Sequence, residues 1–231
     1  GPSAAILFVD LDQFKSVNDT LGHHVGDALL KSVGERIAGC VSGNDVVARL
    51  GGDEFAILHH RPLASTRLLA KQLVDAFKLP FSNEHGDIVI GASVGVALAP
   101  EHGQNTDALL KSADLALYGA KANGAGTYCF FEPEMEELAH RRRDLEVGLR
   151  MAMENGELAI DYQPVIDLES GAIAGCEALM RWNSPEWGDV SPSEFIPVAE
   201  ATGLIASLGE WILNEAATTA RQWPDGTTVA V

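Results

Sequence analysis

The sequence has little positive charge. Its 16 Lys and Arg residues are outnumbered by 33 Asp and Glu residues, and the formal net charge is −17. So acidic a protein repels nucleic-acid phosphates and anionic membranes. We therefore expect no nucleic-acid partner and no direct membrane contact. A small nucleotide is not excluded by this charge, because a metal ion can neutralise its phosphates.

Long apolar runs and cysteines are also scarce. No uninterrupted apolar run approaches the ~20 residues that cross a bilayer, and the start shows no basic-then-apolar secretory leader. We expect a cytoplasmic location for this stretch, while a membrane-anchored sensory region before Gly1 stays open. Cys40, Cys129 and Cys176 lack metal-ligand spacing, so we expect reduced, buried thiols.

The most informative stretch is a glycine pair followed by two acids, residues 51–54. The runs on either side, 45–49 and 55–58, are apolar and typical of short strands, and the glycines are typical of the turn between them. Glycine lets a backbone approach a polyanion closely. The adjacent carboxylates could hold Mg²⁺, which takes one or two protein oxygens plus substrate phosphates. The alternative is a surface turn with solvated acids.

A second acidic stretch follows the apolar run 4–9, which is typical of a strand buried on both faces. Asp10 and Asp12 come directly after this run. Rigid strand ends are favourable positions for metal ligands, whereas acids at such a place can also cap the following turn. Residues 14–19 are expected to form a loop.

The remaining pattern of the first half predicts an α+β domain. Apolar residues at helical spacing, followed by Gly39 or Pro80 as stops, indicate helices. We expect helices over 27–38, 63–77 and 105–121, and further strands over 87–90, 93–98 and 127–131. This order predicts helices packed on a mainly antiparallel central sheet.

The second half predicts a different architecture. Residues 132–155 have helical spacing, with early acids and a later arginine triplet that suit the helix dipole, so the triplet is interpreted as solvated. Beyond this linker helix, strands over 158–164, 173–181 and 228–231 alternate with helices over 193–201 and 207–222. Such alternation is typical of the opening of a (βα)8 barrel, although a complete barrel takes ~250 residues.

Seven sequence blocks resemble two known families. Residues 10–19, 22–27, 49–55 and 113–121 resemble the GGDEF domain of diguanylate cyclases, in the family's order. Residues 162–164, 177–182 and 195–200 resemble the start of an EAL phosphodiesterase domain. We therefore expect a GGDEF domain of the nucleotidyl-cyclase, palm-like fold over 1–132. A linker helix that continues as the first EAL helix is expected over 133–156, and the N-terminal part of the EAL barrel over 157–231.

The first resemblance implies condensation of two GTP into cyclic di-GMP by two domains that meet at least transiently as a homodimer. It implies that Asp10, Asp53 and the Leu11 carbonyl bind Mg²⁺ or Mn²⁺, and that Glu54 helps to activate the attacking 3′-hydroxyl. Two carboxylates from separate elements suit metals that stabilise an in-line displacement.

The same resemblance assigns the substrate contacts. It implies that Asn18 and Asp27 bind the guanine edge and that Lys121 contacts the phosphates. The second resemblance implies metal-dependent hydrolysis of cyclic di-GMP to linear pGpG, with Glu177 as a metal ligand and Gln163 and Arg181 at the substrate. Strand ends are where barrel enzymes hold their chemistry. The family's other ligands lie further along the chain than Val231, so hydrolysis is expected only of the intact protein.

Three departures from the GGDEF pattern leave two readings open. Ala125 stands where the family has a phosphate-binding arginine, a bidentate donor that lysine does not replace. The family's product-inhibition frame Arg-x-x-Asp reads Ser-Gly-Asn-Asp over residues 42–45, and its initial helix has no counterpart in this sequence. The first reading is a bifunctional enzyme, in which a GTP-binding first domain regulates the phosphodiesterase. The alternative is a catalytically silent receptor of GTP or cyclic di-GMP that signals through the interdomain helix.

Overall fold

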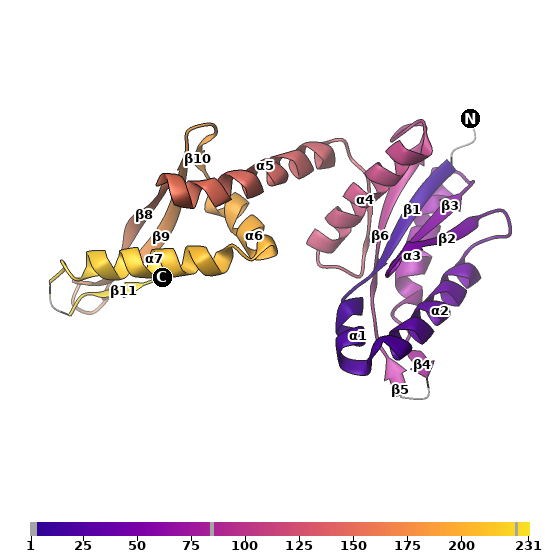
Figure 1. The fold of residues 1–231 in the computed structure, drawn as a ribbon, viewed down its shortest axis with the longest axis horizontal. Helices are drawn as coiled ribbons and strands as arrows, with labels where there is room; N and C mark the ends of the chain where they lie inside the picture. The colour runs from indigo at the N-terminus through magenta and orange to yellow at the C-terminus, as the bar shows by residue number, and fades with distance from the viewer. Residues whose placement is uncertain (1–3, 84–85, 225) are drawn as a thin grey trace. The chain divides into compact units, whose positions relative to one another are not determined.

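The computed structural model describes residues 4–83, 86–224 and 226–231, and its contacts divide the chain into two compact units. Unit 1 is Gly1–Ala139 and unit 2 is His140–Val231; each is described by itself (Figure 1). Helix α5 (Glu134–Asn155) runs across this division. The domain boundaries expected near residues 132 and 156 stay predictions.

Unit 1 is built on a five-stranded sheet with the order β2-β3-β1-β6-β7. Its strands are β1 (Ala4–Leu11), β2 (Val46–Gly51), β3 (Glu54–His59), β6 (Ala92–Ala99) and β7 (Tyr128–Phe130). Only the pairing of β6 with β7 is parallel among these neighbours. The mainly antiparallel sheet expected from the sequence is confirmed.

Helices cover both faces of this sheet (Figure 1). α2 (His23–Cys40) and α3 (Leu63–Ala76) pack on one face, against odd-numbered β1 residues such as Leu7 and Val9. α4 (Thr106–Ala122) packs on the other face, against Ile6 and Phe8. Both faces of β1 are therefore buried, which is why its sequence is a continuous apolar run rather than an alternating one.

The close approach of α4 to the sheet depends on Gly95 in β6. A Cβ atom at Gly95 would lie 1.9 Å from the Ala113 carbonyl oxygen and 2.2 Å from the Leu117 amide nitrogen. These are backbone atoms of α4, which cannot move aside as a flexible side chain can. Gly95 thus fixes how α4 lies over β1 and β6.

The structure corrects several local expectations in unit 1. Residues 14–19 belong to helix α1 (Phe14–Leu21), in which Phe14 is buried and Val17 packs against the core. The apolar spacing i, i+3, i+7 of that segment was the available signal. Gly39 lies inside α2, which continues to Cys40. Residues 86–88 form β5 of a separate hairpin with β4 (Phe81–Asn83), not a strand of the main sheet.

The three thiols are free but only half-buried, so the expectation of buried thiols was wrong. Burial nevertheless raises the pKa of the Cys40 and Cys129 thiols above the usual value. Because the thiolate is the reactive form, this shift lowers the reactivity of both.

Unit 2 consists of a second sheet with helices. β8 (Leu158–Ile166), β9 (Ile173–Ser184) and β10 (Gly188–Val190) are antiparallel neighbours, and β11 (Thr228–Ala230) is parallel to β9. α6 (Pro192–Thr202) and α7 (Ile205–Ala220) follow β10. Trp182 is fully buried at the centre of a core that includes Leu145, Leu149 and Phe195. The opening strands and helices of the expected barrel are present, and the described residues do not close one.

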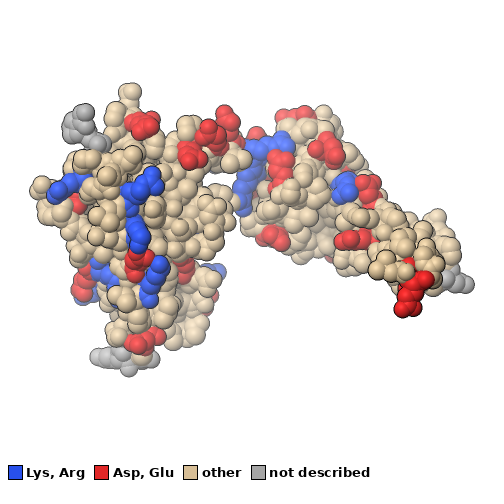
Figure 2. Space-filling view, turned by 180° about the vertical axis from the view of Figure 1, so that it is seen from behind, with Lys and Arg blue, Asp and Glu red and all other residues tan. Residues whose placement is uncertain are grey.

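Figure 2 shows acidic side chains scattered over the visible faces of both units rather than collected in one patch. Within the described residues, no helix combines the length and apolar character that a bilayer crossing needs.

Candidate functional site

The candidate site of unit 1 lies where β1 ends and the β2–β3 hairpin turns. Asp10 of β1 is the cross-strand partner of Glu54 at the start of β3, so their side chains project from the same face of the sheet. Gly52 adopts a positive φ of 50° in the turn. The Arg49 guanidinium donates from Nε and Nη2 to the Gly52 carbonyl oxygen, at 2.9 and 2.7 Å. Asp53 therefore follows a turn that its own hairpin stabilises.

Asp10 pairs with Lys121 from the last turn of α4. The Lys121 Nζ atom lies 2.6 Å from Asp10 Oδ1. The Asp10 side chain is 11% exposed, whereas the Lys121 side chain is 42% exposed. A nearly buried carboxylate on the sheet is therefore neutralised by a cation that retains access to solvent.

Burial is the main influence on the ionisation of the Asp10 carboxyl. Burial raises the pKa of the Asp10 carboxyl, and the charges of Asp53 and Asp12 act in the same direction. The hydrogen bond and the charge of Lys121 lower this pKa but do not outweigh the burial. Asp53 directly precedes Glu54, the cross-strand partner of Asp10, so both acids belong to the same end of the sheet.

Asp12 ties three segments together beside this site, a role that we did not predict. Its Oδ1 accepts a hydrogen bond from Ser93 Oγ at 2.7 Å, and its Oδ2 accepts one from the Gly126 amide at 2.9 Å. The Asp12 amide in turn donates to the Gly91 carbonyl at 3.0 Å. Asp12 therefore holds the end of β1, the start of β6 and the loop after α4 in one arrangement.

The loop after α4 carries the departure at Ala125. Ala125 has a positive φ of 55°, between Gly124 and Gly126, which are also left-handed. A polar pocket of about 390 Å³ lies beside this loop and is lined by Asp12, Gln13 and residues 124–126, among others. The residues that line it do not include Asp10 or Asp53. A methyl group thus stands at the position where the resemblance implies a guanidinium.

The two residues expected at the guanine edge lie at the junction of α1 and α2. Asn18 Oδ1 lies only 1.9 Å from where a Cβ of Gly26 would be, so its amide group rests on the Gly26 backbone. Asp27 follows Gly26 and is exposed. The absence of a side chain at Gly26 therefore brings the Asn18 amide next to the residue that precedes Asp27.

The donors at the β1 end suit Mg²⁺ better than a metal held by protein side chains alone. The described residues contain no group of three or more His, Cys, Asp or Glu that could hold a metal. Mg²⁺ needs only one or two carboxylates when substrate phosphates and water supply the other oxygens. Asp10, Asp53 and the backbone of Leu11 offer such hard oxygen donors, and an ammonium group already occupies one Asp10 oxygen.

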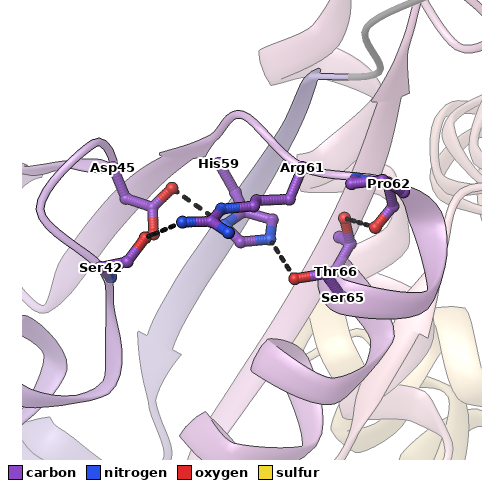
Figure 3. Close-up of polar contacts among 7 residues, drawn as sticks. All are labelled: Ser42, Asp45, His59, Arg61, Pro62, Ser65 and Thr66. Atoms are coloured by element: carbon purple, nitrogen blue, oxygen red, sulfur yellow. Dashed lines mark hydrogen bonds and ion pairs between the residues drawn. The ribbon is translucent and has the colours of Figure 1, made fainter.

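The loop before β2 contains a polar cluster at a different place in unit 1 (Figure 3). Asp45 Oδ1 lies 2.9 Å from His59 Nδ1, and His59 Nε2 lies 3.2 Å from Ser65 Oγ. Asp45 Oδ2 accepts hydrogen bonds from Ser42 N and Oγ. Although burial alone would raise the pKa of the Asp45 carboxyl, these hydrogen bonds from Ser42 and His59 hold it below its usual value. The carboxylate of the 42–45 frame is thus engaged inside the protein.

In unit 2 the three expected site residues come from the β8–β9 pair. Gln163 and Glu177 are cross-strand partners, and both are exposed. Arg181 lies on the same face of β9 as Glu177, and its Nε donates to Asp161 Oδ2 at 2.8 Å. A cavity of about 320 Å³ reaches from this part of β9 to α6 and α7. The structure gathers these residues on one sheet face, and their roles stay predictions.

Comparison with known proteins identifies two domain families in this chain. The family model described as "Diguanylate cyclase, GGDEF domain" matches residues 1–127, and the EAL domain model matches residues 146–231. The bifunctional diguanylate cyclase/cyclic di-GMP phosphodiesterase MucR of Pseudomonas aeruginosa is 45% identical over 96% of this chain. The chain spans 33% of that protein, about a third of its length.

Two solved structures resemble this chain over its first half. The GGDEF domain of PA1120 (YfiN or TpbB) from Pseudomonas aeruginosa is 38% identical, with a TM-score of 0.55 over 57% of this chain and 83% of that one. The GGDEF domain of DgcB from Caulobacter crescentus, solved in complex with c-di-GMP, is 28% identical, with a TM-score of 0.51 over 56% and 78% of the two chains. Both likenesses support the fold described for unit 1.

Proposed function

Because this chain belongs to the GGDEF family and continues into the first part of an EAL domain, we propose that unit 1 binds GTP with Mg²⁺ and condenses two GTP to cyclic di-GMP. We propose further that the intact protein hydrolyses cyclic di-GMP to linear pGpG through its EAL domain. The observation that carries the first proposal is the pair of Asp10 and Lys121, 2.6 Å apart, at the end of the sheet where Asp53 precedes Glu54, the cross-strand partner of Asp10.

Asp10, Asp53 and the Leu11 carbonyl are the groups that would hold the metal. When bound, Mg²⁺ would neutralise the triphosphate and polarise the phosphate that is attacked. The protein's part is to fix these oxygens: Asp10 is set by its strand, and Asp53 by the turn that Arg49 holds. Such preorganised charge is usually the largest contribution to catalysis.

The other residues orient the nucleotide and move a proton. In the proposed site the Asp27 carboxylate accepts hydrogen bonds from N–H groups of the guanine edge, the Asn18 amide can accept or donate there, and Lys121 binds the phosphates. Each 3′-hydroxyl attacks the α-phosphate of the other GTP, so that two P–O bonds form and two pyrophosphates leave. Glu54 assists removal of each hydroxyl proton. Since each copy of unit 1 holds one GTP, two copies of the chain must meet with these sites face to face.

The proposal for the EAL part concerns the intact protein. Glu177 would be one metal ligand, and Gln163 and Arg181 would contact the substrate from the same face of the β8–β9 pair. One water molecule would be consumed and one phosphodiester P–O3′ bond broken, which opens the cyclic dinucleotide to the linear product.

A second function is favoured by Ala125. Loss of an arginine at a phosphate removes a bidentate charged donor and weakens stabilisation of the transition state. A unit that keeps Asn18, Asp27 and Asp53 but lacks this donor could bind GTP without turning it over. In that case unit 1 is a GTP- or cyclic di-GMP-binding receptor that signals through α5.

The experiment measures product formation and binding on the same samples. Purified chain is incubated with GTP and Mg²⁺, and cyclic di-GMP is followed by chromatography. Thermal unfolding with and without GTP is followed by far-UV circular dichroism. Asp53→Ala is the test variant, and Asp189→Ala, an exposed acid of unit 2, is the matched control.

We expect wild type and Asp189→Ala to form product and Asp53→Ala to lose it by about 100-fold or more. A GTP-induced rise in melting temperature without product in any variant would replace the cyclase by the receptor. Identical product in wild type and Asp53→Ala, or no thermal shift with GTP at all, would contradict the nucleotide site.

A further inference from the structure

The contact between Lys121 and Asp10 lies at the end of an apolar interface. Ile6 and Phe8 of β1 face α4 and are followed by Asp10 on the same side of the strand. On α4, the buried Leu109, Ala113 and Leu117 recur every four residues, and Lys121 is the next member of that series. The series of α4-facing residues on β1 thus ends in an acid, and the series on α4 ends in a base. Lys121 Nζ lies 2.6 Å from Asp10 Oδ1.

The position of α4 is fixed by packing, whereas the end of the Lys121 side chain is exposed to solvent. Gly95 sets the position of α4 through the backbone at Ala113 and Leu117. The Lys121 side chain itself is 42% exposed, whereas the Asp10 side chain is 11% exposed. The ammonium group can therefore leave toward solvent while the carboxylate stays in place.

Two other charged side chains at this end of the sheet are engaged in hydrogen bonds of their own. Both oxygens of Asp12 accept hydrogen bonds, from Ser93 and from Gly126. The Arg49 guanidinium is bound to the Gly52 carbonyl. Among the residues that the structure describes, Lys121 is the cation that pairs with Asp10, and a nearly buried carboxylate needs such a partner.

The Asp10 oxygen that Lys121 holds is not open to a metal ion, so a metal on that oxygen requires the ammonium group to move. A divalent cation on Asp10 would stand beside the ammonium group and be repelled by it. We propose that Lys121 is a stand-in cation for the metal site. In the free protein it holds Asp10 and keeps metal affinity low, and it moves to the phosphates when metal and nucleotide bind together. This inference rests on the proposed GTP site, and it makes binding of metal and nucleotide cooperative.

The test is Mn²⁺ binding to the 231-residue chain without nucleotide, measured by loss of the EPR signal of free Mn²⁺. Mn²⁺ suits the same oxygen ligands as Mg²⁺. Lys121→Met removes the ammonium group and keeps an apolar stem with good helix propensity. Lys111→Met is the matched control, because Lys111 lies on the same helix and pairs with Glu136, so the same charge is lost.

We expect Lys121→Met to bind free Mn²⁺ about tenfold more tightly than wild type, and Lys111→Met to differ less than about twofold. Adding Asp53→Ala to Lys121→Met should abolish the gain, which separates this site from Mn²⁺ held by the acidic surface. Far-UV circular dichroism checks that each variant is folded. Lys121→Gln, a second neutral replacement, should reproduce the gain.

Equal affinities for Lys121→Met and Lys111→Met, or a gain that survives Asp53→Ala, would overturn the stand-in role. A parallel titration of wild type with Mn²⁺ and a non-hydrolysable GTP analogue separates this failure from that of the proposed function. If the analogue raises Mn²⁺ affinity but Lys121→Met gives no gain, only the role of Lys121 is lost. If neither occurs, the GTP site is lost as well.

Discussion

The two units of the chain present their expected site residues in different ways. Unit 1 covers both faces of its sheet with helices, and its acids lie at a strand end and a hairpin turn of that sheet. Unit 2 covers one face of the β8–β9 pair, and Gln163 and Glu177 lie exposed on the other. In unit 1 a strand, a turn and a helix converge on one charge, Asp10.

This difference shows how covering both faces of a sheet changes the electrostatics of a site. Asp10 is held in low-dielectric surroundings by packing above and below β1, and its carboxylate therefore interacts strongly with Lys121, 2.6 Å away. On the exposed face of unit 2, Arg181 pairs with Asp161 in water, where such a pair is worth little. Substitutions in each unit can test whether the two units are as independent as this comparison implies.

The largest effect is expected from Trp182→Ala in unit 2. Trp182 is fully buried, packs edge-on against Trp187 and Phe195, and donates from Nε1 to Glu157. Its truncation should lower the free energy of unfolding of unit 2 by about 3–5 kcal/mol. All four tryptophans lie in residues 140–231, so fluorescence of the remaining three reports urea unfolding of unit 2 alone.

The control in this experiment is Trp223→Ala. Because Trp223 is half-buried, this substitution should lower the free energy of unfolding of unit 2 clearly less than Trp182→Ala does. The unfolding transition of unit 1, followed by circular dichroism, should be unchanged in both variants. A parallel loss in that transition would mean that the two units unfold as one.

The corresponding test in unit 1 is Gly95→Ala. The new methyl group would meet the α4 backbone at 1.9 and 2.2 Å, so we expect a loss of about 3 kcal/mol or more in unit 1. Gly119→Ala on α4 is the control, since its Cβ meets only side-chain atoms at 3.6 Å or more, and the substitution should stabilise by up to about 1 kcal/mol. Equal stability of both variants would show that α4 is not fixed at Gly95.

A smaller effect, with a defined pH dependence, is expected from Asp45→Asn. Asp45 has a lowered pKa in the folded protein, so its contribution is present above the unfolded-state value near 3.8 and is lost as the pH falls through the folded value. At neutral pH the substitution should cost about 1–3 kcal/mol. Urea unfolding by circular dichroism should show this difference shrink toward pH 3, and a constant difference would contradict the assignment.

The smallest effect belongs to Asp75 on the exposed surface of α3. Lys71 and Lys78 lower the pKa of its carboxyl to about 2. Stabilisation by this cluster is present above the unfolded pKa and is lost as the pH falls toward 2. Asp75→Asn should lower the melting temperature only slightly at low salt and not at all in 1 M NaCl, because exposed pairs are screened. A melting-temperature difference that persists in 1 M NaCl would show that Asp75 stabilises the protein by packing rather than by its ion pairs with Lys71 and Lys78.

Local patterns predicted the part of the site that consists of strand ends and turns. The apolar run before Asp10, the glycines before Asp53 and the helix that ends near Lys121 each indicate one element, and the structure confirms these elements. The pairing of Asp10 with Lys121 was also within reach, because the series Leu109, Ala113, Leu117 predicts the side of α4 on which position 121 lies.

Contacts between distant segments could not be predicted from the sequence alone. Asp12 binds Ser93, 81 residues away, and Gly126, 114 residues away, and no local pattern at these positions indicates a partner. The hairpin of β4 and β5 was missed because its three-residue strands are too short for periodicity to appear. The engagement of Asp45 with His59 likewise depends on the register of β3, which only the folded sheet provides.

The central claim is that Asp10 and Asp53 share a metal ion with a bound nucleotide. A crystal of the chain grown with Mn²⁺ and a non-hydrolysable GTP analogue tests it most directly, by the anomalous signal of the metal. We predict a peak within about 2.2 Å of an oxygen of both carboxylates, with Lys121 moved from Asp10 to the phosphates. A metal bound elsewhere, or a nucleotide bound without either carboxylate, would contradict it.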